Sequence, residues 1–387
     1  MNKFKQNSYM TNEFIPVNTP LIGEEEKILV NNCLNTGWIS SEGSYIKDFE
    51  DKIASMCNRK FAVAVTSGTA AIDIAIASSN LKKGDEVIVP TFSIISCISE
   101  ILRRGIKPIF IDVDPRTWNI DVNKIEEKIS AKTKAIMAVH IYGLPVDIGK
   151  IDYLAKKFNL FVIEDAAEMI GQTYDKLPCG SFGDMSIFSF YPNKHITTGE
   201  GGMILTNSST LYEKCKSLRN LCFIPEQRFI HYELGWNYRM TNMQAALGIG
   251  QLERLPQIIK RKREIGKLYN EYLKDCSLIN LPLSKTNHSE NIYWVYGITI
   301  KNKKLTSEFL RKELFKRSIG TRPFFYPLHK QPVLKKYIPS YKENLTGFPH
   351  SEEIWLRGLY LPSGIGIQNK QIKYISETLI EILKSFS

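Results

Sequence analysis

Short apolar runs alternate with segments of helical periodicity over the first half of the chain. A helical pattern begins near residue 24, a loop is expected at 37–43, and a second helical pattern continues to residue 57. Further helical patterns reach residue 77 after the strand at 61–65 and recur at 94–103, 122–129 and 148–158. The apolar runs, which we interpret as buried strands, are 61–65, 86–90, 108–113, 135–140, 160–164, 186–190 and 202–206. Apolar strands alternating with helices favour a mostly parallel sheet that is covered on both faces. The sequence therefore predicts a large α/β domain.

The pattern changes in the last third of the chain. Residues 240–273 have helical periodicity, and Pro256 is expected to interrupt the helix. A strand is expected at 292–300, followed by helices at 307–317, 354–360 and 370–383. These elements predict a smaller α+β domain. The expected organisation is an extended N-terminal arm over 1–23, a large domain over 24–256, and a C-terminal domain with its linking helix over 257–387.

Composition narrows the functional classes. The chain has 51 Lys and Arg against 40 Asp and Glu, a formal net charge of +11, which favours anionic ligands. The basic residues are scattered and do not cluster with aromatic residues, so nucleic acid is not an expected partner. The seven cysteines are widely spaced without a CxxC motif, which is typical of reduced thiols. No apolar run approaches a membrane span, so a cytoplasmic protein is expected.

The candidate chemistry centres on residues 160–205. In this segment a buried apolar run ends in Glu164 and Asp165, and Lys194 lies further along. A carboxylate at the carboxyl end of a buried strand is placed in a crevice of an open α/β sheet. A lysine held in the same crevice can become a nucleophile. A carboxylate with a lysine is the pair that a pyridoxal-phosphate site requires.

A second signal lies where the run 61–65 gives way to a helical pattern. The turn Ser67-Gly68-Thr69 opens that helix. Free N–H groups and the helix dipole at such a position favour the binding of a phosphate. His140 is expected to satisfy a strand end, because no neighbouring residues complete a metal-ligand set. No metal is expected.

Taken together, the motifs resemble the DegT/DnrJ/EryC1/StrS family of nucleotide-sugar aminotransferases over nearly the whole chain. This resemblance implies pyridoxal phosphate as cofactor and the aspartate-aminotransferase-like fold, fold type I of the pyridoxal-phosphate-dependent transferases. The matching segments are GWISS (37–41), GDEVIVPTF (84–92), HIYG (140–143), EDAAE (164–168), SFYPNK (189–194), GEGG (199–202), GWNYRM (235–240), LH (328–329) and LPS (361–363).

The resemblance implies roles for individual residues. Lys194 matches the Schiff-base lysine, and Asp165 matches the residue that pairs with the pyridine nitrogen. Ser189, with Gly68 and Thr69, matches the phosphate site. Glu168 lies where relatives contact the phenolic oxygen of the cofactor, where a carboxylate would need a proton or a cation. Ile94 stands where relatives often carry an aromatic residue that packs on the cofactor ring, so aliphatic packing is expected.

The other implied contacts involve the substrate and a second subunit. Asn237 resembles an asparagine that reaches the cofactor phosphate of the other subunit, which implies a homodimer with a shared active site. Arg239 is expected either to pair with a phosphate or to hold its loop. His329 and Arg322 are candidates for contact with the sugar or the diphosphate.

The segments 114–119 and 193–203 are most similar to the branch of the family that aminates C4 of GDP-4-keto-6-deoxymannose. The expected reaction therefore transfers an amino group from glutamate to that sugar, giving GDP-perosamine for surface polysaccharides such as lipopolysaccharide O-antigen. The same reaction on a UDP- or dTDP-linked 4-keto-6-deoxyglucose is the nearest alternative. His195, next to Lys194, keeps a sugar dehydratase as a further alternative, and a regulator on this fold is the non-enzymatic one.

Overall fold

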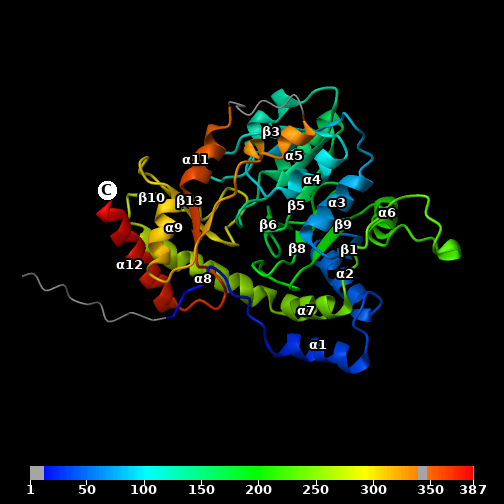
Figure 1. Cartoon of the computed structure of the whole chain (residues 1–387), viewed down its shortest axis with the longest axis horizontal. Helices are drawn as coiled ribbons and strands as arrows, with labels where there is room; N and C mark the ends of the chain where they lie inside the picture. Colours follow the sequence, from blue (N-terminus) through cyan, green and yellow to red (C-terminus); the bar gives the residue numbers. More distant parts are fainter. Residues whose placement is uncertain (1–12, 339–346, 387) are drawn as a thin grey trace, which may run out of the picture.

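The computed structural model describes residues 13–338 and 347–386 of the chain. Its larger sheet has seven strands in the order β1-β9-β8-β5-β4-β2-β3 (Figure 1). All neighbouring pairs from β8 to β3 are parallel, whereas β9 runs antiparallel to both β8 and β1. The prediction of a mostly parallel sheet is confirmed. The strands are β1 (Phe61–Val65), β2 (Glu86–Pro90), β3 (Lys107–Ile111), β4 (Thr133–Val139), β5 (Phe161–Asp165), β8 (Met185–Ser189) and β9 (Gly202–Thr206).

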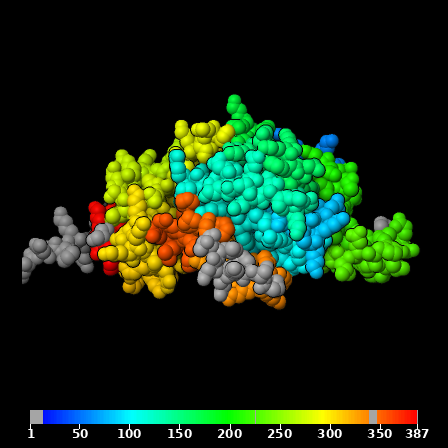
Figure 2. Space-filling view, turned by 90° about the horizontal axis from the view of Figure 1, so that it is seen from above, coloured from blue at the N-terminus to red at the C-terminus, as the bar shows by residue number. Residues whose placement is uncertain are grey.

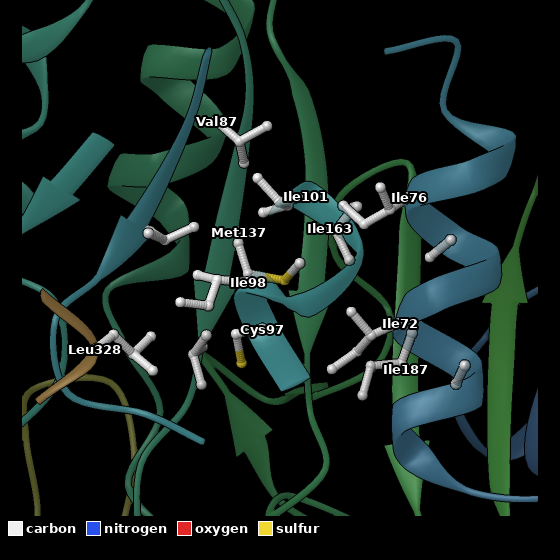
Figure 3. Close-up of a cluster of buried hydrophobic side chains, with 14 of the residues drawn as sticks. Ile72, Ile76, Val87, Cys97, Ile98, Ile101, Met137, Ile163, Ile187 and Leu328 are labelled. Carbon is white, nitrogen blue, oxygen red and sulfur yellow. The ribbon is translucent and has the colours of Figure 1, made fainter. Parts of the chain in front are cut away.

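Helices cover both faces of this sheet, as the continuous apolar strands predict. One face packs against α3 (Gly68–Ser78), α4 (Ser96–Arg103) and α6 (Ser209–Arg219). Figure 3 shows α4 beside α3, both in front of the strands, and Cys97, Ile98 and Ile101 of α4 belong to the core that these helices form with the sheet. The other face packs against α2 (Ser44–Met56), α5 (Ile148–Phe158) and α7 (Asn242–Glu253). The helix α1 (Glu24–Thr36) packs against α7.

A smaller antiparallel sheet lies beside the large one. Its strand order is β10-β11-β13-β12, and it has a core of its own together with three helices (Figure 1). The long helix α8 runs below both parts and packs against α12. The elements are β10 (Ile279–Asn280), β11 (Tyr296–Ile300), β12 (Arg322–Pro323), β13 (Gly358–Leu361), α8 (Leu255–Leu273), α9 (Ser307–Phe315) and α12 (Asn369–Ser385), with the short α10 (Leu334–Tyr337) and α11 (Pro349–Arg357) nearby.

The helix expected at 354–360 is confirmed only as far as Arg357 and is wrong beyond it. The helix α11 ends at Arg357, and Gly358–Leu361 forms β13, an inner strand of the small sheet. A Cβ atom at Gly358 would lie 2.1 Å from the Phe324 ring, so this position requires glycine. A short apolar run has the same pattern in a buried helix and in a buried strand, which explains the error.

The helix expected at 122–129 is also wrong, because this segment forms two short 3₁₀ turns, Val122–Lys124 and Glu126–Lys128. Of their residues and the Ile125 between them, only Ile125 is fully buried. The Asp121 side chain caps the first turn by accepting from the N–H of Asn123. A segment with so little apolar burial does not repay the cost of helix nucleation.

Some boundaries also differ from the expectations. The strand expected at 292–300 begins only at Tyr296, since Tyr293 has a positive φ of 49°. The helix break is confirmed but falls at Arg254, and Pro256 lies in the first turn of α8, where proline is tolerated. Most of the arm at 1–23 lies outside the described residues, although Ile15 pairs with Ile319 of the smaller part.

Within residues 13–338 and 347–386, no helix has an apolar stretch long enough to cross a bilayer.

Candidate active site at the carboxyl ends of the central strands

The parallel strands β4, β5 and β8 bring their carboxyl ends to one edge of the sheet. There β5 ends on Asp165 and β8 ends on Ser189. The loop after β8 returns to β9 and is closed by hydrogen bonds between backbone groups, with the Phe190 N–H donating to the carbonyl of Gly201 over 2.9 Å. The Phe190 ring is fully buried against Phe49, 5.0 Å between centroids. The loop that contains Lys194 is therefore held firmly in place.

Lys194 points its amine into a largely buried space. Its Nζ atom lies 3.8 Å from Oε1 of Glu168 and 3.8 Å from the centroid of the Trp294 ring. Burial lowers the pKa of Lys194, and the nearby carboxyl groups of Glu168 and Asp165 oppose that shift. An amine with a lowered pKa is more often unprotonated, which is the form that acts as a nucleophile or a base.

Asp165 is buried at the same edge, and both of its oxygens accept hydrogen bonds. The N–H of Ala167 donates to Oδ1 over 3.1 Å, and the Cys97 thiol donates to Oδ2 over 3.4 Å. Burial raises the pKa of Asp165, while these hydrogen bonds and the charge of Lys194 act in the opposite direction. The carboxyl group is therefore held in a fixed orientation near the amine.

Glu168 lies between Lys194 and the backbone of Tyr142. The N–H of Tyr142 donates to Oε2 over 2.6 Å. Burial raises the pKa of Glu168 to about 8, although Lys194 and this hydrogen bond both lower it. Burial therefore favours the protonated, uncharged form of Glu168.

Glu164, the neighbour of Asp165, points to the opposite face of β5, since successive strand residues alternate. It accepts from the N–H groups of Gly180 and Phe182 over 2.7 and 2.9 Å, and its Oε1 lies 3.0 Å from Nε2 of His140. The other nitrogen of His140 accepts from the N–H of Val146 over 3.1 Å, so Nε2 carries the proton.

His140, Glu164 and Cys179 lie close enough to hold a metal ion, with their candidate ligand atoms all within 4.8 Å of one another. The hydrogen bonds of His140 and Glu164 already use both ring nitrogens and both carboxylate oxygens. The cluster is therefore built as a hydrogen-bonded link between strand ends.

The turn that was predicted to bind phosphate meets the end of β8. Ser67 caps α3 by accepting from the N–H of Ala70 over 3.1 Å. A Cβ atom at Gly68 would lie 2.7 Å from the Cβ atom of Ser189, so only glycine allows this approach. The N–H groups of Gly68 and Thr69 precede the first helical hydrogen bonds and can bind an anion. The Thr69 hydroxyl lies 2.8 Å from that of Ser96.

The remaining predicted residues differ in their surroundings. Ile94 is 48% exposed just before α4, and Asn237 is exposed. The Arg239 guanidinium donates to Oδ1 of Asn220 over 2.7 Å, which favours the loop-holding alternative. Arg322 is exposed and lines a pocket beside the lysine loop, together with Asn18, Tyr191, Pro192, Asn193, Trp294 and Tyr360.

Like His140, the other two histidines singled out in the sequence are buried. His329 lies 3.1 Å from Glu352 through Nε2, and burial lowers its pKa. Burial lowers the pKa of His195 to about 3, with a further contribution from Lys262, so this ring is neutral. Its Nε2 lies 3.4 Å from the carbonyl of Ile292. Thus it is Lys194, and not His195, that meets Glu168.

Sequence reasoning missed two neighbours of the site. Cys97 lies inside an apolar helix, and Trp294 lies in a run interpreted as a strand, so the local pattern of each indicates core. The sequence signal for Trp294 is its place in the segment N-I-Y-W-V-Y, which is rich in aromatic residues. Both contacts join residues that are far apart in the sequence.

Comparisons with known proteins agree with this geometry. The model of the DegT/DnrJ/EryC1/StrS aminotransferase family matches residues 20–380. The GDP-perosamine synthase of Escherichia coli O157:H7 is 42% identical over 369 residues, which are 95% of this chain and 98% of that protein.

Solved structures add to these comparisons. The E. coli GDP-4-keto-6-deoxy-D-mannose-3-dehydratase with bound hydrated pyridoxal phosphate is 26% identical, with a TM-score of 0.87, and the match covers 95% of this chain and 100% of that one. A variant of such a dehydratase (ColD) with bound GDP-perosamine has the same identity and TM-score, over 94% of this chain and 100% of that one.

We expect the change Glu164→Gln to destabilise the fold. An amide has one acceptor oxygen, so its NH₂ group must face at least one of the donors from Gly180, Phe182 and His140. A buried donor left without a partner costs about 1–3 kcal/mol of the free energy of unfolding. Urea denaturation of the cofactor-free protein measures this cost, with the exposed Glu213→Gln on α6 as control. A loss no larger than that of the control would contradict the structural role of Glu164.

Proposed function

The chain belongs to the DegT/DnrJ/EryC1/StrS aminotransferase family, and we propose that it aminates C4 of a 4-keto-6-deoxy nucleotide sugar with pyridoxal phosphate as cofactor. The proposed reaction converts GDP-4-keto-6-deoxymannose to GDP-perosamine, with glutamate as amino donor. The observation that carries the proposal is the buried amine of Lys194 beside Glu168 at the strand edge that ends on Asp165. The 42% identity to a protein named GDP-perosamine synthase supports the choice of substrate.

The residues present fit pyridoxal phosphate. Lys194 offers an amine to its aldehyde, and Asp165 offers a carboxylate to its ring nitrogen. The turn at Gly68, pressed against Ser189, offers backbone N–H groups to its phosphate. The large, mostly parallel sheet with a smaller second sheet is the arrangement of fold type I transferases. When bound, the cofactor supplies a ring that accepts the electron pair left on the substrate carbon when a proton departs.

Lys194 and Asp165 have the central roles. The Lys194 amine holds the cofactor covalently and, once free, moves a proton to and from the substrate carbon. Burial lowers its pKa and so favours the unprotonated base. Asp165 keeps the ring nitrogen protonated, and the donors from Ala167 and Cys97 fix its orientation.

Five other residues complete the cofactor site in this proposal. Thr69 and Ser189 bind the phosphate together with Gly68, and Ile94, partly exposed at the start of α4, packs on the ring face. Glu168 lies near the phenolic oxygen. Its raised pKa keeps it uncharged near pH 7, so it donates a hydrogen bond there without repelling the oxygen.

A homodimer with a shared active site is part of the proposal. The segment 222–236 stands away from the body of the molecule (Figures 1 and 2). Along it Phe229, Ile230, Tyr232 and Leu234 are 82, 52, 77 and 92% exposed. Such a projecting apolar segment favours burial against another protein, and we propose a second copy of the chain. Asn237 follows this segment and would reach the cofactor phosphate of the partner subunit.

The substrate would enter beside Arg322, which is exposed in the pocket next to the lysine loop. Its charge and the net charge of +11 suit a sugar that carries two phosphates. His329 already bonds Glu352, which makes it a weaker candidate for sugar contact. A UDP- or dTDP-linked substrate stays the alternative. Lys194, and not His195, contacts Glu168, which favours transamination over dehydration.

We expect the purified protein to be yellow and to aminate a GDP-linked 4-keto-6-deoxyhexose with glutamate. The assay also offers the UDP- and dTDP-linked sugars and measures product by mass spectrometry. Lys194→Ala should lose the visible band on dialysis against an amine and lower kcat by about 10³-fold or more. Lys301→Ala, an exposed lysine, should change neither. A borohydride-reducible linkage retained in Lys194→Ala would contradict the lysine assignment.

We expect Glu168 to make cofactor binding depend on pH. Because its pKa is raised to about 8, the side chain is neutral below that pH and negative above it. In the wild type the affinity for pyridoxal phosphate should therefore fall above pH 8 relative to Glu168→Gln, by roughly tenfold per pH unit at most. Absorbance titrations of cofactor-free protein from pH 6.5 to 9.5 measure both affinities. A ratio of the two dissociation constants that is independent of pH would exclude this role.

Leu234→Glu should separate the subunits, because it places a charge at the most exposed apolar position of segment 222–236. Sedimentation velocity should show a monomer, and activity should fall with the dimer fraction. Leu177→Glu, a 51% exposed leucine outside this segment, is the control.

Asn237→Ala should stay dimeric but bind the cofactor about tenfold more weakly, through loss of one hydrogen bond to a charged group. A fully active monomer at assay concentration would rule out the shared site.

A further inference from the structure

Trp294 forms a wall of the space around Lys194, although it comes from the residues just before β11. It is 4% exposed, and its ring centroid lies 3.8 Å from the Lys194 Nζ atom. A cation over the face of an indole ring is attracted by the ring's quadrupole, more strongly where water is excluded. The ring therefore favours the ammonium form of Lys194 in a place where burial disfavours it.

The indole is fixed in this position by a hydrogen bond next to the lysine. Its Nε1–H donates to the backbone carbonyl of Asn193 over 2.7 Å. Asn193 directly precedes Lys194, so one side chain contacts both the backbone of the lysine loop and the lysine's amine. The ring cannot turn away without breaking this bond.

The backbone of Trp294 is fixed as well. Lys262 of α8, which is only 3% exposed, donates to the carbonyls of Trp294 and Ser363 over 2.8 and 2.6 Å. The ring also packs against Tyr142, 5.8 Å between centroids. Trp294 is thus fixed by three separate parts of the chain.

We propose that Trp294 is a positioning residue, which holds the Lys194 amine in the pocket and stabilises its ammonium form whenever that amine is not bonded to the cofactor. The proposal rests on the proposed function, since a transaminase lysine is released in each turnover. The released amine takes a proton from the substrate carbon and becomes an ammonium, while the electron pair of the C–H bond stays with substrate and cofactor.

The carboxyl groups nearby favour the ammonium form too, but each has another constraint. Glu168 is the nearest at 3.8 Å, and burial favours its protonated form. Asp165 has its own donors from Ala167 and Cys97 and is assigned to the cofactor's ring nitrogen. The Trp294 face is neutral, so it stabilises the ammonium without competing for the proton.

The test compares Trp294→Leu, which removes the ring, with Trp294→Phe, which keeps a ring face but loses the N–H donor. In cofactor-free protein, the rate of Lys194 acylation by acetic anhydride against pH reports the pKa of its amine. We expect Trp294→Leu to lower that pKa by about one unit and Trp294→Phe by less than half a unit. Trp355→Leu, a half-buried tryptophan on α11, is the matched control and should not change it.

In the holoenzyme, single-turnover mixing with glutamate should show the cofactor band converting about tenfold more slowly in Trp294→Leu. KM for glutamate should change less than twofold.

If Trp294→Leu does not fold, tetrafluorotryptophan at position 294 keeps the shape of the ring but removes its negative face. This variant should lower the pKa of Lys194 by a similar amount.

The outcomes separate this proposal from the proposed function. An unchanged Lys194 pKa and an unchanged half-reaction rate in an active Trp294→Leu enzyme would overturn the role of Trp294. Equal losses in Trp294→Phe and Trp294→Leu would also overturn it, because the N–H donor would then be responsible. A wild type that binds no pyridoxal phosphate would instead refute the proposed function, while the acylation experiment would still measure the contact with the ring.

Discussion

The site depends on burying one amine and two carboxyl groups together. Removal of water lowers the pKa of Lys194 and raises those of Asp165 and Glu168, so each group is shifted toward its neutral form. Buried polar groups are tolerated only with partners. Here the partners are a thiol and two backbone N–H groups, which hold the carboxyl groups without supplying a full positive charge. The amine is therefore left able to react.

This arrangement needs firm support, and β5 provides it by alternation. Asp165 faces the amine, whereas Glu164 points to the other face of the strand. There it accepts hydrogen bonds from His140, Gly180 and Phe182. The two adjacent carboxyl groups thus have different tasks. Glu164 links the end of β4 to the loop after β7 (Leu177–Pro178) and so holds the end of β5 in place. Asp165, at that strand end, is therefore in a fixed position for chemistry.

Much of the large sheet could be predicted from the sequence, because its strands are continuous apolar runs between turn residues. The error at 354–360 arose because a short apolar run can be either helix or strand, and tertiary contacts decided between them. The error at 122–129 arose because that segment buries too little apolar surface to stabilise a helix. Asp165 and Lys194 were found because they belong to linear motifs. Cys97 and Trp294 were not, since their importance comes from contacts with residues far away in the chain.

The contacts of Trp294 also explain how the smaller part of the molecule can influence the lysine. Lys262 holds Trp294 through a backbone carbonyl, and Trp294 holds the lysine loop through the carbonyl of Asn193. A path of two hydrogen bonds therefore leads from the buried face of α8 to the residue beside Lys194. Carbonyl oxygens are the same in every residue, so such a path leaves no motif in a sequence. The motif residues of the large sheet supply the reactive groups. The position of the Lys194 amine among them also depends on α8 and on Trp294, which precedes β11.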